Sequence, residues 1–209
     1  MYTPKQFKEE NLETLYALMK ASPLGLLVSV GADGPLVTAV PFLLKAELSD
    51  NGTLQCHVAR ANPQWQSLDG QRVLVVFQGV DTYISPSWYA SKAVHGKVVP
   101  TWNYVMVQAR GKAKVIESSD WLLKQITALT HQQESKRPTQ WQVSDAPADY
   151  IDAEIKHIVG IEIGIDSLEG KWKASQNRNA DDRRGVADNL MQEGDVDMAE
   201  LVRRYGNTN

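Results

Sequence analysis

Apolar residues near the N-terminus follow two different periods. Those after Asn11 recur at helical spacing up to Met19, which predicts an amphipathic helix whose apolar stripe packs on the core. Residues 26–30 and 36–40 are instead β-rich, and the glycine-bounded segment 31–34 between them has the composition of a tight turn. The pattern therefore predicts a helix followed by a β-hairpin.

A third β-rich run, at 53–58, follows the turn residues 50–52. Three strands joined by short turns are expected to form an antiparallel meander. Pro41 lies where the second strand continues, and it removes a backbone donor from that strand. This indicates an edge strand, a bulge or the mouth of a ligand site.

Three further strands are predicted downstream. Residues 73–77 are apolar on both faces, which is typical of a buried strand. Residues 102–116 predict a long strand in which Gly111 marks a bulge or a close backbone approach. Residues 161–166 alternate between apolar and polar, as in a strand with one solvated face. Glu169-Gly170 is then expected to turn the chain before a further extended segment.

Helix signals separate and follow these strands. A helix capped by Ser118 or Ser119 is expected to precede a polar loop at 130–143, and Pro147 is expected to start a helix that Gly160 ends. All of these helices are amphipathic. They are therefore expected to flank the sheet.

Two short helices are predicted at the C-terminal end, about 179–205. Asn179 can cap the first helix and Gly194 can end it. Two helices around a tight turn invite comparison with a helix-turn-helix, but this pair is rich in acidic residues and lacks a basic recognition face. Packing helices are the favoured interpretation.

The overall charge argues against a basic nucleic-acid-binding surface. The 209 residues carry a net charge of −3 and the pI is near 5.8. A local basic patch is compatible with these values. DNA therefore stays an open partner without support from charge.

Several kinds of chemistry have no motif here. The four histidines lie far apart and no CxxC occurs, so no metal site is expected. Nucleophile-elbow, Walker and GxGxxG patterns are also missing. The single cysteine, Cys56, cannot form an internal disulfide, and no apolar run has membrane length. The expected location is the cytoplasm, without membrane association.

The segment 57–65 combines several anion-binding features. A strand runs into a predicted helix in which Asn62 is a good N-cap and Pro63 suits the first position. Arg60 stands just before this helix end, where free backbone N–H groups and the helix dipole favour a phosphate or carboxylate. The alternative is a structural turn with Arg60 in a surface ion pair, and the segment alone leaves both open.

Aromatic residues with polar tips gather in two segments, 83–89 and 99–104. Such residues suit the stacking and hydrogen bonding of a planar, partly polar ligand. They suit a subunit interface equally well. Between them, residues 91–97 read as a mobile loop and a candidate lid.

Taken together, several segments resemble the PaiB-like family of FMN-binding split-barrel proteins, which are described as negative transcriptional regulators. The matching segments are Met1-Tyr2-Thr3-Pro4, Val37-Thr38-Ala39-Val40-Pro41-Phe42, His57-Val58-Ala59-Arg60-Ala61-Asn62-Pro63, Tyr83-Ile84-Ser85-Pro86-Ser87-Trp88-Tyr89, Val99-Pro100-Thr101-Trp102-Asn103-Tyr104 and Lys171-Trp172-Lys173-Ala174-Ser175-Gln176-Asn177-Arg178. They span nearly the whole chain in order. One departure is Ala174, where a larger apolar residue is expected.

The resemblance implies a mainly β fold with flanking helices: a six-stranded antiparallel split β-barrel that forms a single domain over residues 1–209, with the C-terminal helices packed on it. It also implies a homodimer with FMN at the subunit interface, so an aromatic site can be both interface and pocket. The implied cofactor-binding residues are Thr38, Val40, His57 and Val58 at the isoalloxazine, Arg60 and Asn62 at the phosphate, and Trp102, Asn103, Tyr104, Lys173, Gln176 and Arg178 completing the site, some of them from the partner. The alternative for residues 171–178 is a structural link between the C-terminal helices and the barrel.

Two functions are compatible with this resemblance. The first is an FMN-binding regulator or flavin-dependent sensor that affects transcription. The second is an FMN-dependent oxidoreductase that acts on a small molecule, since bound FMN itself can carry the electrons. A flavin store or a purely structural dimer is a third option. The residues do not choose among them.

Overall fold

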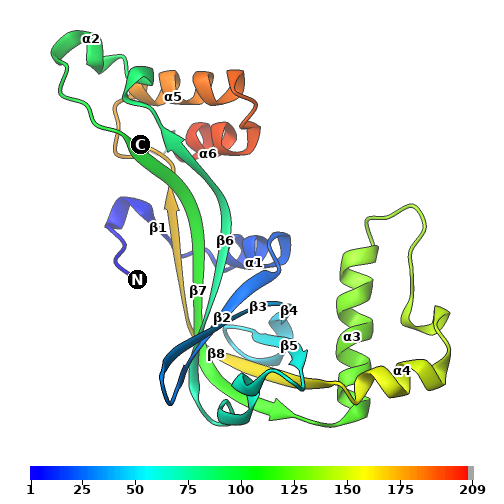
Figure 1. Ribbon diagram of the computed structural model, residues 1–209. Coiled ribbons are helices and arrows are strands. Elements are labelled where there is room, and N and C mark those ends of the chain that lie inside the picture. Colours follow the sequence, from blue (N-terminus) through cyan, green and yellow to red (C-terminus); the bar gives the residue numbers. More distant parts are fainter. Residues whose placement is uncertain (207–209) are drawn as a thin grey trace. The chain divides into compact units, whose positions relative to one another are not determined.

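The computed structural model describes residues 1–206 and consists of one antiparallel sheet with flanking helices (Figure 1). The sheet order is β3-β2-β6-β7-β8-β5-β4, and β1 pairs with β8. Eight strands are present among the described residues, where the family resemblance implies six. The strands are β1 (Lys8–Glu9), β2 (Leu24–Gly31), β3 (Gly34–Pro41), β4 (Leu43–Lys45), β5 (Thr53–Ala59), β6 (Arg72–Ile84), β7 (Thr101–Ile116) and β8 (Ile158–Lys173).

Amphipathic helices separate and follow the strands in the sequence, as the periodicity predicts. The α-helices are α1 (Leu12–Ala21), α2 (Ser91–His95), α3 (Ser119–Glu134), α4 (Ala148–Ile155), α5 (Ala180–Gln192) and α6 (Val196–Gly206), and the 3₁₀-helices are η1 (Lys5–Phe7), η2 (Ala46–Leu48), η3 (Pro63–Ser67), η4 (Pro86–Trp88) and η5 (Val143–Asp145). Predicted N-caps are confirmed: the side chains of Ser118 and Asn179 accept backbone N–H bonds of α3 and α5.

The chain divides into two compact units. Unit 1 contains Met1–Leu18, Gln78–Val107 and the described residues from Glu169 onward. Unit 2 contains Met19–Phe77 and Gln108–Leu168. Strands β6, β7 and β8 contribute residues to both units.

The core of unit 2 follows from strand alternation. Leu27 on β2 and Val75 on β6 are fully buried, while their neighbours in sequence are more exposed, and Ile161 on β8 is fully buried as well. Phe42 packs edge-to-face on Phe77 with ring centroids 5.6 Å apart. Burying these large apolar side chains supplies most of the favourable free energy of this unit.

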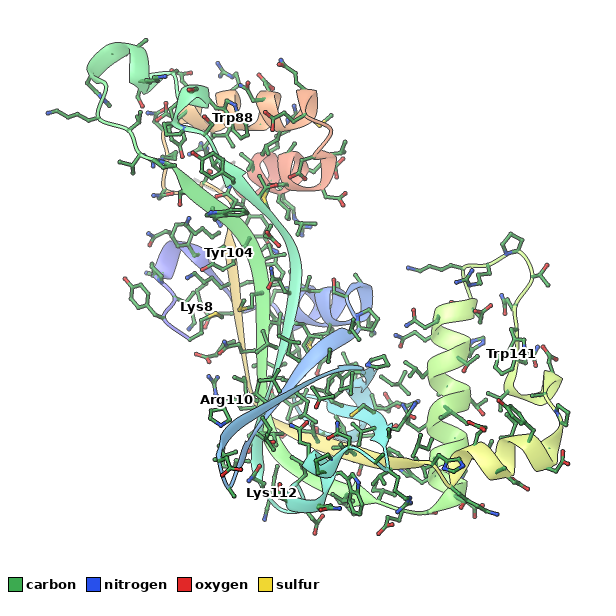
Figure 2. All side chains as sticks on the ribbon, in the orientation of Figure 1. Lys8, Trp88, Tyr104, Arg110, Lys112 and Trp141 are labelled. Carbon is green, nitrogen blue, oxygen red and sulfur yellow. The ribbon has the colours of Figure 1, made fainter. Side chains whose placement is uncertain are left out.

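The core of unit 1 holds the C-terminal helices α5 and α6 against the ends of its strands. Ile84 at the end of β6, Tyr89 after η4 and Ala174 after β8 are buried together with side chains of both helices. The helical members of this cluster are Val186, Ala187, Leu190, Met198, Ala199 and Val202. Figure 2 shows Trp88 beside α5, and a Cβ on Gly185 of that helix would lie 2.1 Å from the Trp88 carbonyl oxygen. These helices therefore dock on strand ends of their own unit.

The predicted hairpin is confirmed, and the predicted meander is present with an interruption in its second strand. β2 and β3 pair from Leu24↔Pro41 to Gly31↔Gly34, and β3 is an edge strand, as Pro41 indicates. β4 continues this strand after Phe42 and pairs antiparallel with β5, as the meander predicts, although β4 and β5 stand at the opposite end of the sheet order. The chain changes position in the sheet at Pro41-Phe42, where the ladder is interrupted.

Other boundaries also differ from the predictions. The expected turn at Glu169-Gly170 is wrong, because β8 runs through it without a break. Gly170 pairs with Glu9 of β1, and a Cβ there would lie 2.3 Å from Leu15 Cδ2, so the glycine serves a close approach. The expected loop at 91–97 contains α2, and the expected loop at 130–143 starts only after α3 ends at Glu134.

The helix that Pro147 starts ends at Ile155 rather than at Gly160. Residues Ile158 to Gly160 already pair with β5. Ile158 fits the helical spacing of the preceding isoleucines, but it equally fits the alternation of the strand.

Gly111 illustrates the close approach that the sequence predicts. A Cβ at this position would lie 2.0 Å from the carbonyl oxygen of Gly164. A Cβ on Gly164 itself would meet no atom within 4 Å. Of these two positions, only 111 is therefore too crowded for a residue with a Cβ atom.

We expect Gly111→Ala to lower the free energy of unfolding by about 1–3 kcal/mol, because the added methyl group must displace backbone. The matched control Gly164→Ala should leave the free energy of unfolding nearly unchanged. Chemical denaturation of both variants measures the difference. Equal stability of the two variants would contradict the close approach.

Candidate functional site

Arg60 lies directly after β5, and its guanidinium is held by several groups of unit 2. Nε donates to the Lys156 carbonyl at 2.9 Å and Nη2 donates to the Ile158 carbonyl at 3.3 Å. Nη1 forms an ion pair with Glu117 Oε2 at 2.5 Å. The Arg60 side chain is 38% exposed and that of Glu117 is 57% exposed. The surface ion pair expected as one alternative is therefore present, at a position open to solvent.

The turn after Arg60 has the capping that the sequence predicts. Asn62 Oδ1 accepts the Gln64 N–H at 2.9 Å, and Pro63 takes the first helical position. The following element is a five-residue 3₁₀-helix, which is too short for a strong dipole. Asn62 Nδ2 donates to Thr38 Oγ1 at 3.2 Å. Both polar side-chain atoms of Asn62 thus have partners within the protein.

A buried glutamine links this turn to the β2–β3 hairpin. Gln64 Nε2 donates to Ser29 Oγ at 2.9 Å and to the Leu27 carbonyl at 3.3 Å, and Gln64 Oε1 accepts a short hydrogen bond from Thr38 Oγ1. The network brings together Thr38 and Asn62, both of which the family resemblance implies. The sequence does not indicate Gln64 as a site residue, because its burial depends on strands that are distant in sequence.

The strand residues implied at the flavin ring differ in accessibility. Val40 and Val58 are buried in the core, 5% and 4% exposed. His57 is half-buried, and its Nδ1 lies 2.8 Å from Gln125 Oε1 of α3. The Gln125 amide nitrogen is buried with no hydrogen-bond partner. His57 is therefore the one of these three whose side chain is open to a ligand.

In unit 1, the implied residues of β7 alternate between the two faces of the strand. Trp102 is 53% exposed and meets Tyr83 edge-on, with ring centroids 6.0 Å apart. Asn103 is fully buried and exchanges hydrogen bonds of 3.0 and 3.3 Å with Ser175. The ring centroid of Tyr104, which is labelled in Figure 2, lies 5.1 Å from Lys171 Nζ in a cation–π contact.

The end of β8 and the segment after it gather three cations. Lys173 Nζ donates short hydrogen bonds to Thr101 Oγ1 and the Trp102 carbonyl. Burial, and then the charges of Lys171 and Arg178, lower the pKa of Lys173. Among the described residues, these three cations have no carboxylate partner. They form a positive patch that an anion would relieve.

The remaining implied residues have contacts of their own. The Arg178 guanidinium lies 4.5 Å from the Tyr89 ring centroid. Gln176 accepts the Ala174 N–H at 2.7 Å and donates to the Trp172 carbonyl at 2.5 Å. Gln176 therefore shapes the chain after β8, as does Ser175, whose φ of 62° is left-handed. Tyr89 belongs to the aromatic segment 83–89 that the sequence already indicates, whereas Ser175 is a contact that the sequence did not indicate.

The residues present fit the chemistry of FMN. Its phosphate needs exposed cations, which Arg60 offers in unit 2 and the Lys171–Lys173–Arg178 patch offers in unit 1. Its isoalloxazine needs apolar or aromatic surface, which the β2–β3 hairpin and Trp102 provide in their respective units. The twelve implied residues thus lie as six in each unit.

In the part of the chain that the structure describes, no group of three or more His, Cys, Asp and Glu side chains is placed to hold a metal ion. No helix within residues 1–206 combines the length and apolar character needed to cross a membrane. Cys56 is buried, and burial raises the pKa of its thiol.

Comparisons with known proteins agree on one family. Residues 1–167 match the family model described as "Putative FMN-binding domain". An uncharacterized protein of Emericella nidulans is 37% identical, over 99% of this chain and 98% of the relative. The protease synthase and sporulation protein PAI 2 of Bacillus subtilis is 34% identical, over 97% of this chain and 96% of the relative.

A solved structure supports the same fold. The FAD and heme binding protein from Mycobacterium smegmatis superposes with a TM-score of 0.60 and 18% sequence identity, over 79% of this chain and 73% of that one. At this identity the likeness concerns the fold alone. Together with the antiparallel sheet order and the flanking helices, it identifies the fold as the flavin-binding split barrel.

Proposed function

The chain belongs to the PaiB-like family of FMN-binding split-barrel proteins, and from this premise we propose that it is a flavin-dependent sensor with a role in transcriptional regulation. FMN is its cofactor. The observation that carries the regulatory role is the 34% identity with PAI 2, whose name refers to protease synthase and sporulation, over nearly the full length of both chains. With a net charge of −3, the regulatory output is more compatible with a protein partner than with a basic DNA-binding face.

We assign the FMN phosphate to Arg60. An exposed ion pair such as Arg60–Glu117 contributes little to stability. A phosphate offers a higher charge and bidentate geometry to the same guanidinium. Two backbone carbonyls and the Trp65 ring, 5.8 Å from the guanidinium carbon, already orient Arg60. Replacement of the Glu117 carboxylate by phosphate would therefore require little further ordering of the Arg60 side chain.

Other residues of unit 2 position this site. Asn62 and Thr38 act through the Gln64 network, which fixes the turn beside Arg60 and the hairpin. His57 is proposed to face the isoalloxazine, whose bound form supplies reversible electron transfer. The positive patch of unit 1, formed by Lys171, Lys173 and Arg178, is a second candidate site for the phosphate. The same binding assay tests it separately.

We further propose that the chain forms a homodimer through the outer face of the β2–β3 hairpin. Alternation places apolar side chains of both strands on this face, and several are largely exposed, including Val37 at 57%. Monomers rarely expose contiguous apolar patches of this kind without a binding role. The residues of the face are Leu24, Leu26, Val28, Val30, Pro35, Val37, Ala39 and Pro41.

We expect Arg60→Ala to weaken FMN binding about 10- to 100-fold, the loss of one charge-assisted contact. Riboflavin, which lacks the phosphate, should bind both proteins alike. Glu117→Gln should tighten FMN binding, because it removes the competing carboxylate. Flavin fluorescence titration measures all three.

Arg72→Ala, which breaks the exposed Arg72–Asp166 ion pair, is the matched control and should bind FMN normally. Lys173→Met tests the positive patch of unit 1 in the same assay. If FMN affinity falls in Lys173→Met but not in Arg60→Ala, the phosphate assignment is wrong.

We expect Val37→Asp to shift the protein from dimer to monomer, because a charge would be buried at the interface. Light scattering coupled to size-exclusion chromatography measures the mass. Val94→Asp is the control: Val94 is 82% exposed on α2, outside this face. A Val37→Asp protein that stays dimeric would exclude the hairpin face.

The sensor proposal is tested in the host. Chromosomal Arg60→Ala should reproduce the transcript changes of a gene deletion, whereas Arg72→Ala should not. Unchanged transcripts in the deletion strain, with multiple-turnover NAD(P)H oxidation by the purified protein, would refute the sensor role and favour the oxidoreductase alternative.

A further inference from the structure

A cavity of about 830 Å³ lies in unit 2 among α3, η5 and α4. Its size is that of a small-molecule site. Figure 1 shows α3, the chain that returns from it, and α4 around this region, and Figure 2 labels Trp141 on the returning chain. None of the twelve residues implied for FMN lines it. Its lining residues are Leu123, Thr127, Thr130, His131, Glu134, Gln140, Trp141, Gln142, Val143, Ser144, Ala146, Ala148, Ile151 and Asp152.

The walls of the cavity come from a regular helix face and an ordered return. Leu123, Thr127 and Thr130 recur at helical spacing on α3, and Leu123 is 40% exposed although it is apolar. The return is fixed at Trp141, whose backbone N–H donates to Glu134 Oε2 at 3.2 Å. The backbone N–H of Gln142 donates to Asp145 Oδ2 at 2.9 Å and continues this order.

The charges in the lining have one sign. Glu134 and Asp152 are its carboxylates, and it contains no Lys or Arg. Glu134 is neutralised by Arg137, whose Nε lies 3.1 Å from Glu134 Oε1. Asp152 is exposed on α4 and has no hydrogen bond or ion pair within residues 1–206. The cavity therefore offers one free carboxylate beside apolar surface.

The side chain of Trp141 complements this charge. It lines the cavity and is 46% exposed. An indole face attracts cations as well as apolar groups, and Trp gives the strongest such contact. A ligand with a protonated amine and an apolar body can satisfy Asp152 and Trp141 together.

We propose that this cavity binds a small organic amine with an apolar body. The amine is held by Asp152, and the body packs against Trp141, Leu123 and Ile151. This site is separate from the proposed flavin site, and the proposal stands whether or not Arg60 binds the phosphate.

Isothermal titration calorimetry with phenethylamine tests the proposal. The protein should bind one equivalent, and the neutral analogue 2-phenylethanol should bind about tenfold more weakly, because it lacks the charge-assisted contact. The anionic analogue 3-phenylpropanoate should bind more weakly still. Equal affinity for amine and alcohol, or no binding of the amine, would overturn the proposal.

Two variants locate the site. Asp152→Asn should weaken phenethylamine binding about tenfold, whereas Asp149→Asn, on the same helix but outside the cavity lining, should not. Ala148→Phe should abolish binding by filling the cavity. Circular dichroism confirms that each variant is folded. Wild-type affinity in a folded Asp152→Asn or Ala148→Phe protein would show that the amine binds elsewhere.

Discussion

Strand β8 imposes the constraint on which the rest of the structure depends. It pairs with β5 through residues of unit 2 and with β1 through residues of unit 1, and it is continuous for 16 residues. Its register fixes the Ile158 carbonyl that Arg60 binds, and its last residue is Lys173. Both candidate anion sites are thus anchored on one strand. Glycine at 170 is what lets β1 approach this strand closely enough to pair.

What the sequence predicts well is local. The caps at Asn62, Ser118 and Asn179 are satisfied within three residues, so the residue type alone carries the signal. The β2–β3 hairpin is equally local. The meander is also local, although its second strand is divided at Phe42 into β3, which pairs with β2, and β4, which pairs with β5. The turn at Glu169-Gly170 failed because glycine serves both turns and close approaches, and only the partner strand decides between them.

The candidate site shows the same division. The family resemblance implies residue types, but burial decides what each can do. Val40, Val58 and Asn103 are buried, so their side chains maintain the core and its hydrogen bonds. Arg60 and Trp102 stay open to solvent. Gln64 could not be predicted, because its partners Ser29 and Thr38 lie on strands whose position is set elsewhere.

The two candidate anion sites differ in how they are prepared for a phosphate. Arg60 is already oriented by two carbonyls and carries a carboxylate that an incoming phosphate can replace, so binding exchanges one anion for another. Lys173 lies among like charges and has a lowered pKa, so an anion bound there would favour the charged form of its amine. The first site gains specificity from preorganised geometry, and the second gains affinity from relief of repulsion. Because a guanidinium does not deprotonate whereas Lys173 titrates more readily than usual, affinity at the second site would fall sooner as pH rises.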